Sequence, residues 1–214
     1  NTLVQRTAAQ FPNKTALQVK RGDIWRKFSY KELKATAEKI SATLQQAELQ
    51  KGDRVVLFSE NKPEWGMAYL GAALMGAVVV PLDAQTWHKE LWAVVRFTGA
   101  RAIIASERCL SRLPRKSLEE NDRLASPARL LNADGLCEPF VIEGLSRSIA
   151  PLKNVKSSKV VVEPDDLASI VFTNSTAVDP KGVIHTHRNF ISNLLGVNSY
   201  LPASESDQLL SVLP

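Results

Sequence analysis

The sequence predicts an α/β protein with a mainly parallel sheet that is flanked by helices on both faces. Between residues 51 and 106, short apolar runs alternate with segments whose apolar residues recur every three or four positions. Such alternation of strands and amphipathic helices is typical of βαβ units and a parallel sheet. The strand-like runs are apolar throughout rather than at every second residue, which indicates that both faces of the sheet are buried.

The first predicted helix covers residues 30–49. Its apolar face is formed by residues three or four apart, namely Leu33, Ala37, Ile40 and Leu44. Ser29 stands just before this helix and Glu32 follows three residues later, a pattern that is typical of a capping box. The turn "KGD" then leads into an apolar strand at residues 55–58, and Asp53 is interpreted as a residue of this turn.

Two further helix–strand units follow. A second helix is predicted from Glu64 to Met75, because Pro63 suits a first helical turn and Gly76 suits a helix end. The β-branched run "AVVVPLD" then predicts a strand, a third helix is expected at residues 88–98, and "ARAIIAS" predicts the next strand.

Beyond this region the pattern weakens, and we expect an irregular excursion over residues 107–160. Residues 107–138 are rich in charge and predict one helix and a loop, "PFVIEG" is interpreted as a further strand, and "SRSIAPLKNVKSSK" as a linker. The chain then reads as strand "DLASIVFT", loop "NSTAVDPKG", strand "VIHTH", helix "RNFISNLLGVNSYL" and strand "DQLLSVLP". We therefore expect a first α/β subdomain over residues 1–164 and the start of the next sheet over residues 165–214, with a loop at 173–182.

Composition and charge favour a globular protein and give little support to nucleic-acid binding. The chain has 214 residues and a formal charge of +5, but its 27 basic residues are interspersed with 22 acidic ones. The densest basic run, "RLPRKS", is followed at once by acidic residues. No groove-reading module or platform of aromatic and basic residues accompanies it, so we expect no nucleic-acid partner.

The cysteines and the apolar segments bear on the compartment. Cys109 and Cys137 have neither metal-ligand spacing nor a disulfide framework, which favours free thiols in a reducing cytoplasm. The first residues do not resemble a secretory signal. The most apolar run, residues 67–82, is interrupted by glycine and proline, so we expect a buried helix and strand there rather than a membrane span.

The segment at 173–182 has the composition of a loop that binds phosphate. Thr173, Ser175 and Thr176 provide hydroxyl groups and Lys181 provides a positive charge, while the backbone N–H groups of such a loop can converge on an anion. It is not a Walker A loop, because that spacing is absent and a strand rather than a helix follows. From these residues alone, an ordinary turn of Ser, Thr and Asp-Pro between two strands is an equal alternative.

Several other side chains are candidates for functional residues. His185 and His187 are expected on one face of a strand, but no third metal ligand is spaced nearby, so we assign no metal site. Core packing is favoured over a substrate channel for the helical side chains Trp65, Met67 and Tyr69. A surface loop is favoured over a site for two residues that follow a strand, Asp83 and His88.

The loop resembles the signature of the adenylate-forming superfamily, which includes acyl-CoA synthetases, luciferases and peptide-synthetase adenylation domains. That signature is approximately Y/F-T-S-G-S/T-T-G-x-P-K-G. "FSYKEL", "YLGAALMGAVVVPLD" and "DLASIVFT" match further family motifs in the same order, and "LLSVLP" matches the approach to the next one. With "GVIHTHRNF", the sequence is most similar to long-chain acyl-CoA synthetases, and only about residues 107–160 fall outside the resemblance.

The resemblance implies an AMP-forming ligase that uses Mg²⁺ and ATP to convert a fatty acid to acyl-AMP and then to acyl-CoA. It implies that the loop holds the ATP phosphates, a positioning and electrostatic task. Three residues match the family pattern: Thr173, Thr176 and Lys181. Four residues depart from it: Asn174, Ser175, Ala177 and Val178, which stand where Ser, Gly, Thr and Gly are usual. A β-branched residue restricts the backbone where glycine would allow close approach by the anion.

The resemblance also limits what this chain is expected to do alone. The family's adenine-binding motif, ribose-binding Asp, magnesium-ligating Glu and C-terminal lid with its catalytic Lys lie beyond the matched motifs, so no catalytic residue is assigned here. A non-catalytic relative that serves as a binding or interaction module is the alternative. A cytoplasmic location is expected with room for a peripheral membrane contact, while acid chain length and oligomeric state are left open.

Overall fold

The computed structural model describes residues 2–114, 129–133, 159–173 and 181–211. Six of its strands form one sheet in the order β6–β5–β3–β4–β7–β8. Their bounds are β3 Arg54–Phe58, β4 Val78–Leu82, β5 Ala102–Ala105, β6 Arg129–Asn132, β7 Leu167–Phe172 and β8 Gly182–Thr186. Strands β3 to β7 are parallel to their neighbours and β8 is antiparallel to β7. The prediction of a mainly parallel sheet is therefore confirmed.

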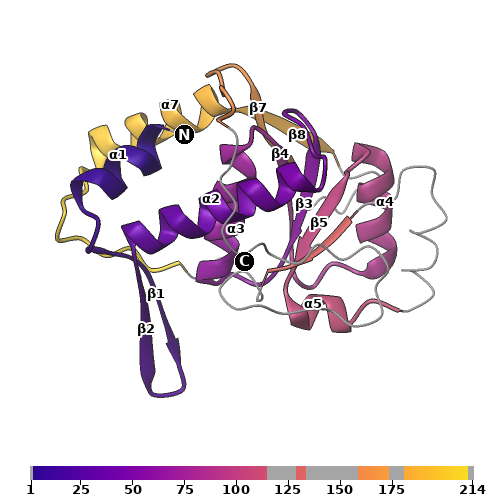
Figure 1. Ribbon diagram of the computed structural model, residues 1–214, viewed down its shortest axis with the longest axis horizontal. Helices are drawn as coiled ribbons and strands as arrows, with labels where there is room; N and C mark the ends of the chain where they lie inside the picture. The colour runs from indigo at the N-terminus through magenta and orange to yellow at the C-terminus, as the bar shows by residue number, and fades with distance from the viewer. Residues whose placement is uncertain (1, 115–128, 134–158, 174–180, 212–214) are drawn as a thin grey trace.

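Helices cover both faces of the central strands, as Figure 1 shows. One face is covered by α2 (Tyr30–Gln46) and α3 (Pro63–Leu74), and the other by α4 (His88–Thr98) and α5 (Glu107–Ser111). Alternate residues of β3 divide between the two cores: Val55 and Leu57 pack with α2 and α3, whereas Val56 and Phe58 pack with α4. Their apolar sequence is thus explained by burial on both faces.

Local signals in the sequence set the ends of these helices. The predicted capping box of α2 is present, because the Ser29 hydroxyl accepts from the Glu32 N–H and the Glu32 carboxylate accepts from the Ser29 N–H. Pro63 opens α3, which ends at Leu74 just before Gly76. No helix among the described residues is both long enough and apolar enough to cross a membrane.

Close packing between α2 and α3 depends on one glycine. A Cβ atom at Gly71 would lie 2.6 Å from the Ile40 Cβ and 2.9 Å from the Ala37 carbonyl oxygen. Both distances are shorter than ordinary contacts between such atoms, so a side chain here would push the helices apart.

Three elements lie outside the central α/β layers. The N-terminal helix α1 (Thr2–Gln10) precedes a two-stranded antiparallel hairpin of β1 (Thr15–Arg21) and β2 (Ile24–Ser29), which projects from the body of the protein. The helix α7 (His187–Tyr200) follows β8 and lies near α1. These N-terminal elements and β6 were not predicted.

Three expectations differ from the structure. No new sheet begins at residue 165, because β7 pairs with β4 in the sheet already formed. The run "VIHTH" is not all strand, since β8 ends at Thr186 and His187 begins α7. Residues 207–211 of "DQLLSVLP" are not in a strand. The strand expected at "PFVIEG" and the linker that follows it lie outside the described residues.

Candidate functional site

Strands β7 and β8 form the frame of the predicted phosphate loop. They pair antiparallel up to Phe172 and Gly182, and the Thr173 N–H donates to the Lys181 carbonyl oxygen at 3.0 Å. The Thr173 and Lys181 side chains are both exposed at this point. The loop residues between them, among which Asn174, Ser175, Thr176, Ala177 and Val178 were predicted to contact ATP, lie outside the described residues.

Gly182 allows the second strand of this frame to approach the first closely. A Cβ atom at Gly182 would lie 3.0 Å from the Ile170 Cγ2 and 3.5 Å from two ring carbons of Phe172. A larger residue would therefore have to displace these side chains next to the loop. The glycine that follows the lysine in the loop thus has a packing reason as well as a place in the motif.

The frame presents the loop at the carboxyl edge of the sheet. Because β3, β4, β5 and β7 are parallel, their carboxyl ends lie at the same edge, where open α/β sheets place their ligands. Polar residues follow the neighbouring strands there: Ser59 and Glu60 after β3, Asp83 after β4 and Ser106 after β5. The two ends of the loop, Thr173 and Lys181, thus lie where the fold class favours a binding site.

A cavity of about 220 Å³ opens next to the end of β3. It is lined by Phe58, Thr86, Trp87, His88, Arg112 and Leu113. Strands β3 and β7 are two positions apart in the sheet, so the cavity at the end of β3 is separated by about 10 Å from the end of β7, where the predicted phosphate loop begins. Because His88 lines this cavity, the prediction that it lies on an ordinary surface loop is wrong. Asp83 behaves as predicted for a loop residue, because its carboxylate accepts from the Gln85 N–H at 2.7 Å.

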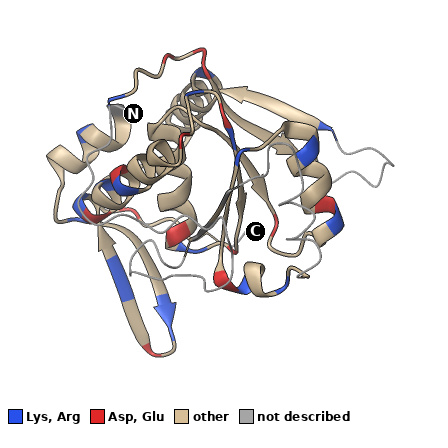
Figure 2. Cartoon of the chain, turned by 45° about the vertical axis from the view of Figure 1, so that its right-hand side comes forward, with Lys and Arg blue, Asp and Glu red and all other residues tan. Residues whose placement is uncertain are grey.

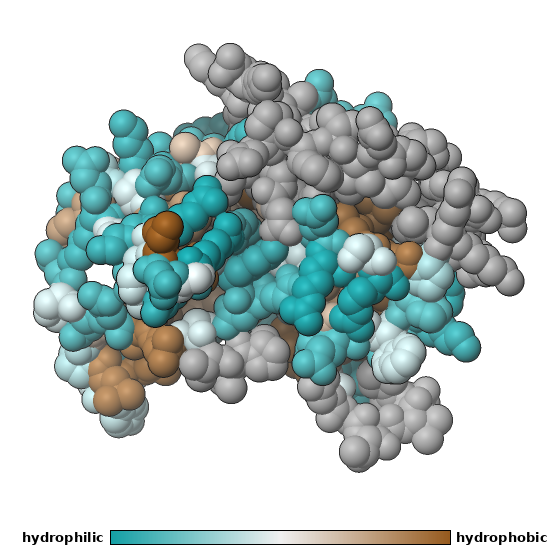
Figure 3. Space-filling view, turned by 90° about the horizontal axis from the view of Figure 1, so that it is seen from below, coloured by the Kyte–Doolittle hydropathy of each residue, from teal (hydrophilic) through white to brown (hydrophobic). Residues whose placement is uncertain are grey.

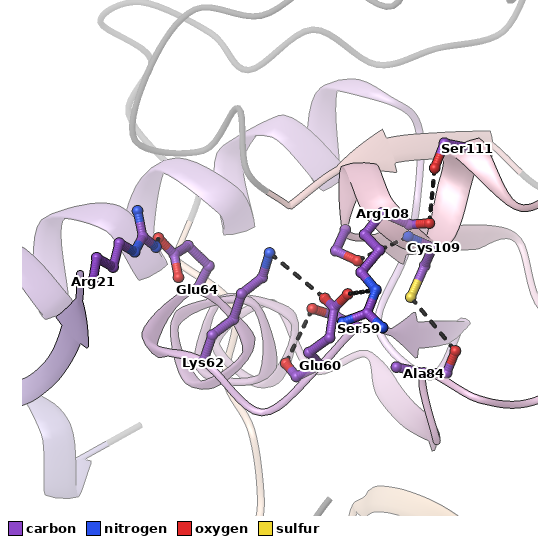
Figure 4. Close-up of polar contacts among 10 residues, drawn as sticks. Arg21, Ser59, Glu60, Lys62, Glu64, Ala84, Arg108, Cys109 and Ser111 are labelled. Carbon is purple, nitrogen blue, oxygen red and sulfur yellow. Dashed lines mark hydrogen bonds and ion pairs between the residues drawn. The ribbon is translucent and has the colours of Figure 1, made fainter.

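Basic side chains near this cavity are already engaged by protein groups. The Glu60 carboxylate lies 3.6 Å from the Arg108 Nε and 3.8 Å from the Lys62 Nζ (Figure 4). The Arg112 guanidinium donates to the Ala84 carbonyl oxygen at 2.6 Å. An anion entering here would have to compete with these contacts, which disfavours this cavity as a phosphate site.

Cys109 is a structural thiol at the same edge. It is fully buried, its N–H donates to the Ser106 hydroxyl, and its sulfur lies 3.9 Å from the Ala84 carbonyl oxygen (Figure 4). Burial raises the pKa of the Cys109 thiol, so the thiolate that a nucleophile requires is disfavoured. The prediction of a free thiol is confirmed for Cys109, whereas Cys137 lies outside the described residues.

The two histidines of "HTH" occupy different environments. His185 lies on β8 with its ring 5.5 Å from that of Phe190, whereas His187 is the first residue of α7 and is half-buried. Burial lowers the pKa of His187, which favours the neutral imidazole. Within the part of the chain that the structure describes, no group of three His, Cys, Asp or Glu side chains could hold a metal ion.

Ion pairs fix the start of α7 to the turn before β7. Arg188 forms a two-point contact with Asp165, at 2.6 and 2.8 Å. The His187 N–H donates to the Asp166 carbonyl oxygen, and the Asp166 carboxylate lies 2.6 Å from the Lys51 Nζ. The lysine lowers the pKa of the Asp166 carboxyl group below its ordinary value. We refer to Lys51, Asp165, Asp166 and Arg188 as the α7 clamp.

The remaining candidates are mainly structural. Met67 is fully buried, and Trp65 and Tyr69 are half-buried with stacked rings 5.4 Å apart, so the preference for core packing is confirmed for Met67. Burial raises the pKa of the Tyr69 hydroxyl. Asp53 is a turn residue as predicted, and its carboxylate accepts from the Gln50 N–H and the Arg101 guanidinium.

Comparison with known proteins identifies the family. Residues 4–214 match the model of the AMP-binding enzyme family. The chain belongs to this family. Its sequence is 29% identical to crotonobetaine/carnitine–CoA ligase from Citrobacter koseri, over 97% of this chain and 40% of that protein. It is 26% identical to 4-coumarate–CoA ligase 3 from Arabidopsis thaliana, over 90% of this chain and 34% of that protein. The chain therefore spans about two fifths or less of the length of these relatives.

Solved structures of AMP-binding enzymes share the fold. O-succinylbenzoate–CoA synthetase from Bacillus subtilis, in complex with AMP, aligns with a TM-score of 0.75 at 19% identity, covering 99% of this chain and 49% of that one. Fatty acyl-adenylate ligase from L. pneumophila, in complex with acyl adenylate and pyrophosphate, aligns with a TM-score of 0.73 at 20% identity, covering 92% and 32%. The resemblance to the adenylate-forming superfamily is thus confirmed, and the relatives above are CoA ligases that differ in the acid they use.

Proposed function

We propose that this chain is part of an AMP-forming ligase that activates a fatty acid. In the first step a carboxylate oxygen attacks the α-phosphorus of ATP, and the bond to pyrophosphate breaks to leave acyl-AMP. In the second step the sulfur of CoA attacks the acyl carbon, its proton is released, and AMP departs with the bonding electrons. Support comes from the family match and from relatives named as CoA ligases, among them a medium-chain acyl-CoA ligase of Rattus norvegicus that is 25% identical over 97% of this chain.

The observation that carries the loop assignment is the hydrogen-bonded frame at the carboxyl edge of the sheet. The main-chain bond between Thr173 and Lys181 holds the two loop ends together, and both side chains face solvent. Lys181 would meet the negative charge of the β- and γ-phosphates, and Thr173 and Thr176 would donate hydroxyl hydrogen bonds. Asn174, Ser175, Ala177 and Val178 would contribute through their backbone N–H groups.

Mg²⁺ enters this proposal with the nucleotide. In such sites Mg²⁺ keeps several waters and is held by substrate phosphates together with one or two carboxylates. The part of the chain described by the structure holds no cluster of three such ligands, so no residue here is assigned to the ion. A cytoplasmic location, and a peripheral membrane contact that would bring the enzyme close to fatty acids, belong to the same proposal.

A non-catalytic binding module is the second candidate, and one observation favours it. Val178 and Ala177 stand where the family pattern has Gly and Thr. A β-branched residue in a position that requires positive φ is strained, and the lost hydroxyl removes one donor to phosphate. These substitutions could lower nucleotide affinity roughly a hundredfold without altering the frame.

Calorimetric titration of the purified chain with Mg·ATP tests the loop assignment. The triple variant Ser175→Gly/Ala177→Thr/Val178→Gly restores the family pattern and is expected to bind ATP roughly a hundredfold more tightly than the natural sequence. Adding Lys181→Gln to this variant should lower the affinity again by at least tenfold, because a cation facing the phosphates is lost. The matched control is Lys159→Gln, which removes an exposed lysine outside the loop.

Two outcomes would overturn parts of this proposal. Unchanged ATP binding in the triple variant would refute the assignment of residues 173–181 to phosphate. If ATP binds but a longer protein containing this chain shows no exchange of labelled pyrophosphate into ATP with any fatty acid, the ligase activity is refuted and the binding module is favoured.

A further inference from the structure

We propose that the β1–β2 hairpin binds the surface of an anionic membrane through its tip and its outward face. The hairpin projects from the body of the protein, and its turn lies at residues 22–23 (Figure 1). Vesicle binding can be measured without ATP or an acid, so this inference does not depend on the proposed ligase activity.

One face of the hairpin anchors it to the protein. Leu17 and Phe28 lie opposite each other and pack into the core beneath α2 and α3. Near the tip on the same face, the Arg21 guanidinium donates to the buried carboxylate of Glu64 at 2.6 Å. These contacts hold the hairpin in a fixed orientation, which leaves its other face turned away from the protein.

The outward face carries one aromatic and two basic residues. Lys20 lies directly opposite Trp25, and Lys27 follows Trp25 by two residues and therefore shares its face. Gln18, opposite Lys27, donates to the Gln208 side chain at 2.9 Å. The base of this face is thus partly covered, and the free part is the end near the tip.

The tip itself exposes two large apolar side chains. Ile24 is 74% exposed and Trp25 is 56% exposed. Scattered exposed apolar residues are ordinary on protein surfaces, but these two lie at the end of a projecting and anchored element, with Trp25 on the outward face and Ile24, opposite Arg21, on the other face. Seen from below, toward which the hairpin points, the surface is largely hydrophilic with small apolar areas (Figure 3). Trp is favoured where an apolar ring meets a polar boundary, as at the headgroup level of a bilayer.

The charge of the hairpin complements an anionic surface. Residues 15–29 contain four basic side chains and one acidic side chain. Arg21 is paired with Glu64, so the outward face presents the charges of Lys20 and Lys27. Figure 2 shows this basic character along both strands. Lysine and arginine near an anionic bilayer each favour binding by about 1 kcal/mol, equivalent to roughly fivefold in affinity. Together with a shallow insertion of Ile24 and Trp25, this is the two-part signal typical of peripheral membrane proteins.

Nucleic acid fits the same residues less well. Single-stranded nucleic acid is bound by several aromatic rings on which successive bases stack. Here Trp25 is the single aromatic residue of the outward face, and its exposed neighbour Ile24 offers no ring to stack on. An aliphatic side chain at the very tip suits acyl chains and lipid headgroups better than bases.

Co-sedimentation with lipid vesicles tests this inference on the purified chain. We expect binding to phosphatidylcholine vesicles containing about 30% phosphatidylserine, weaker binding to pure phosphatidylcholine, and release as salt is raised. Lys20→Gln/Lys27→Gln should lower the partition coefficient roughly twentyfold. Ile24→Ser/Trp25→Ser should lower it at least tenfold and should remove a blue shift of tryptophan fluorescence seen on binding.

The matched control is Lys89→Gln/Arg96→Gln, which removes the same two charges from exposed positions on α4 and should bind as the natural sequence does. Circular dichroism of each variant establishes that it is folded. Equal binding to neutral and anionic vesicles, or hairpin variants that bind as tightly as the control, would overturn the proposal. Binding of single-stranded oligothymidylate without binding to anionic vesicles would also overturn it, in favour of nucleic acid.

Discussion

Strands β3, β4 and β5 are covered on both faces, whereas β8 and α7 expose most of their apolar side chains. In the first region Val56, Val79 and Ile103 are fully buried. In the second, Ile184 is 58% exposed, and α7, which is described along its whole length, buries none of its residues. Strand β8 contains the apolar pair Val183 and Ile184, as the central strands contain apolar runs, but both of these side chains are exposed because less of the protein packs against them. An apolar sequence indicates that a strand or helix tends to be buried, but it does not indicate which segment packs against it.

The largest expected effect comes from shortening matched leucines in α4 and α7. Leu91→Ala should lower the free energy of unfolding by about 3 kcal/mol, because Leu91 is fully buried and a cavity would remain. Leu195→Ala should change it by less than about 0.5 kcal/mol, since Leu195 is 65% exposed. Urea unfolding of both variants measures this. Similar losses for the two would mean that α7 is packed as tightly as α4, and the comparison would fail.

A second pair of variants tests how closely the first region is packed. Gly71→Ala should destabilise the protein by about 2 kcal/mol, because its Cβ would lie within 3 Å of Ile40 and Ala37. The same change at Gly66, in the same helix, places a Cβ 3.7 Å from Leu17 and should stabilise by about 0.5 kcal/mol through helix propensity. Thermal unfolding gives both values, and a shift in the same direction for both variants would contradict close contact at Gly71.

The smallest effect concerns acid stability in the second region. Burial lowers the pKa of His187, so the unfolded chain binds a proton more readily at this residue than the folded chain does. Its contribution to stability is full above pH about 6.5 and is lost as the pH falls through the folded pKa. His187→Gln should therefore reduce the drop in unfolding temperature between pH 7.5 and 5.5, by an amount worth less than about 1 kcal/mol. If the drop in unfolding temperature is unchanged in this variant, burial does not lower the pKa of His187.

Asp166 provides the contrast to that measurement. Its carboxyl pKa is lowered by Lys51, so its contribution is present above about pH 4 and is lost only at lower pH. The two residues of the same segment therefore titrate in separate windows. Asp166→Asn should not lessen the change between pH 7.5 and 5.5 and should enlarge it slightly, because the Asp166 carboxylate raises the pKa of His187.

The central fold was predictable because its signals are local. The apolar runs of β3, β4 and β5, the capping box of Ser29 and the glycine after α3 each act over a few residues. The β1–β2 hairpin was missed, although Gly22 and Asp23 between two β-rich runs are a recognised turn signal. Strand β6 was also missed, because it is only four residues long and lies in a highly charged region. It is stabilised by its pairing with β5, and a local sequence pattern does not reveal such a pairing.

The candidate site was predictable in part. The strand before the loop and the position of the loop followed from "DLASIVFT" and the Pro-Lys-Gly run. The start of α7 was misassigned because the β-branched run suggested strand, although Thr186 and Asn189 form a reciprocal cap that marks a helix start. The α7 clamp joins Lys51 to Asp166 across 115 positions of sequence, and such pairings are set by tertiary structure.

The bond that closes the loop frame, from the Thr173 N–H to the Lys181 carbonyl oxygen, is made by main-chain atoms alone. Any residue other than proline at position 173 could make this bond, so the frame does not depend on the sequence of the loop. Substitutions between these two positions can therefore accumulate at little cost to folding, while under the proposed phosphate role their effect on ligands is large. A family built on such a frame can therefore lose, regain or redirect its chemistry within seven residues and keep its architecture.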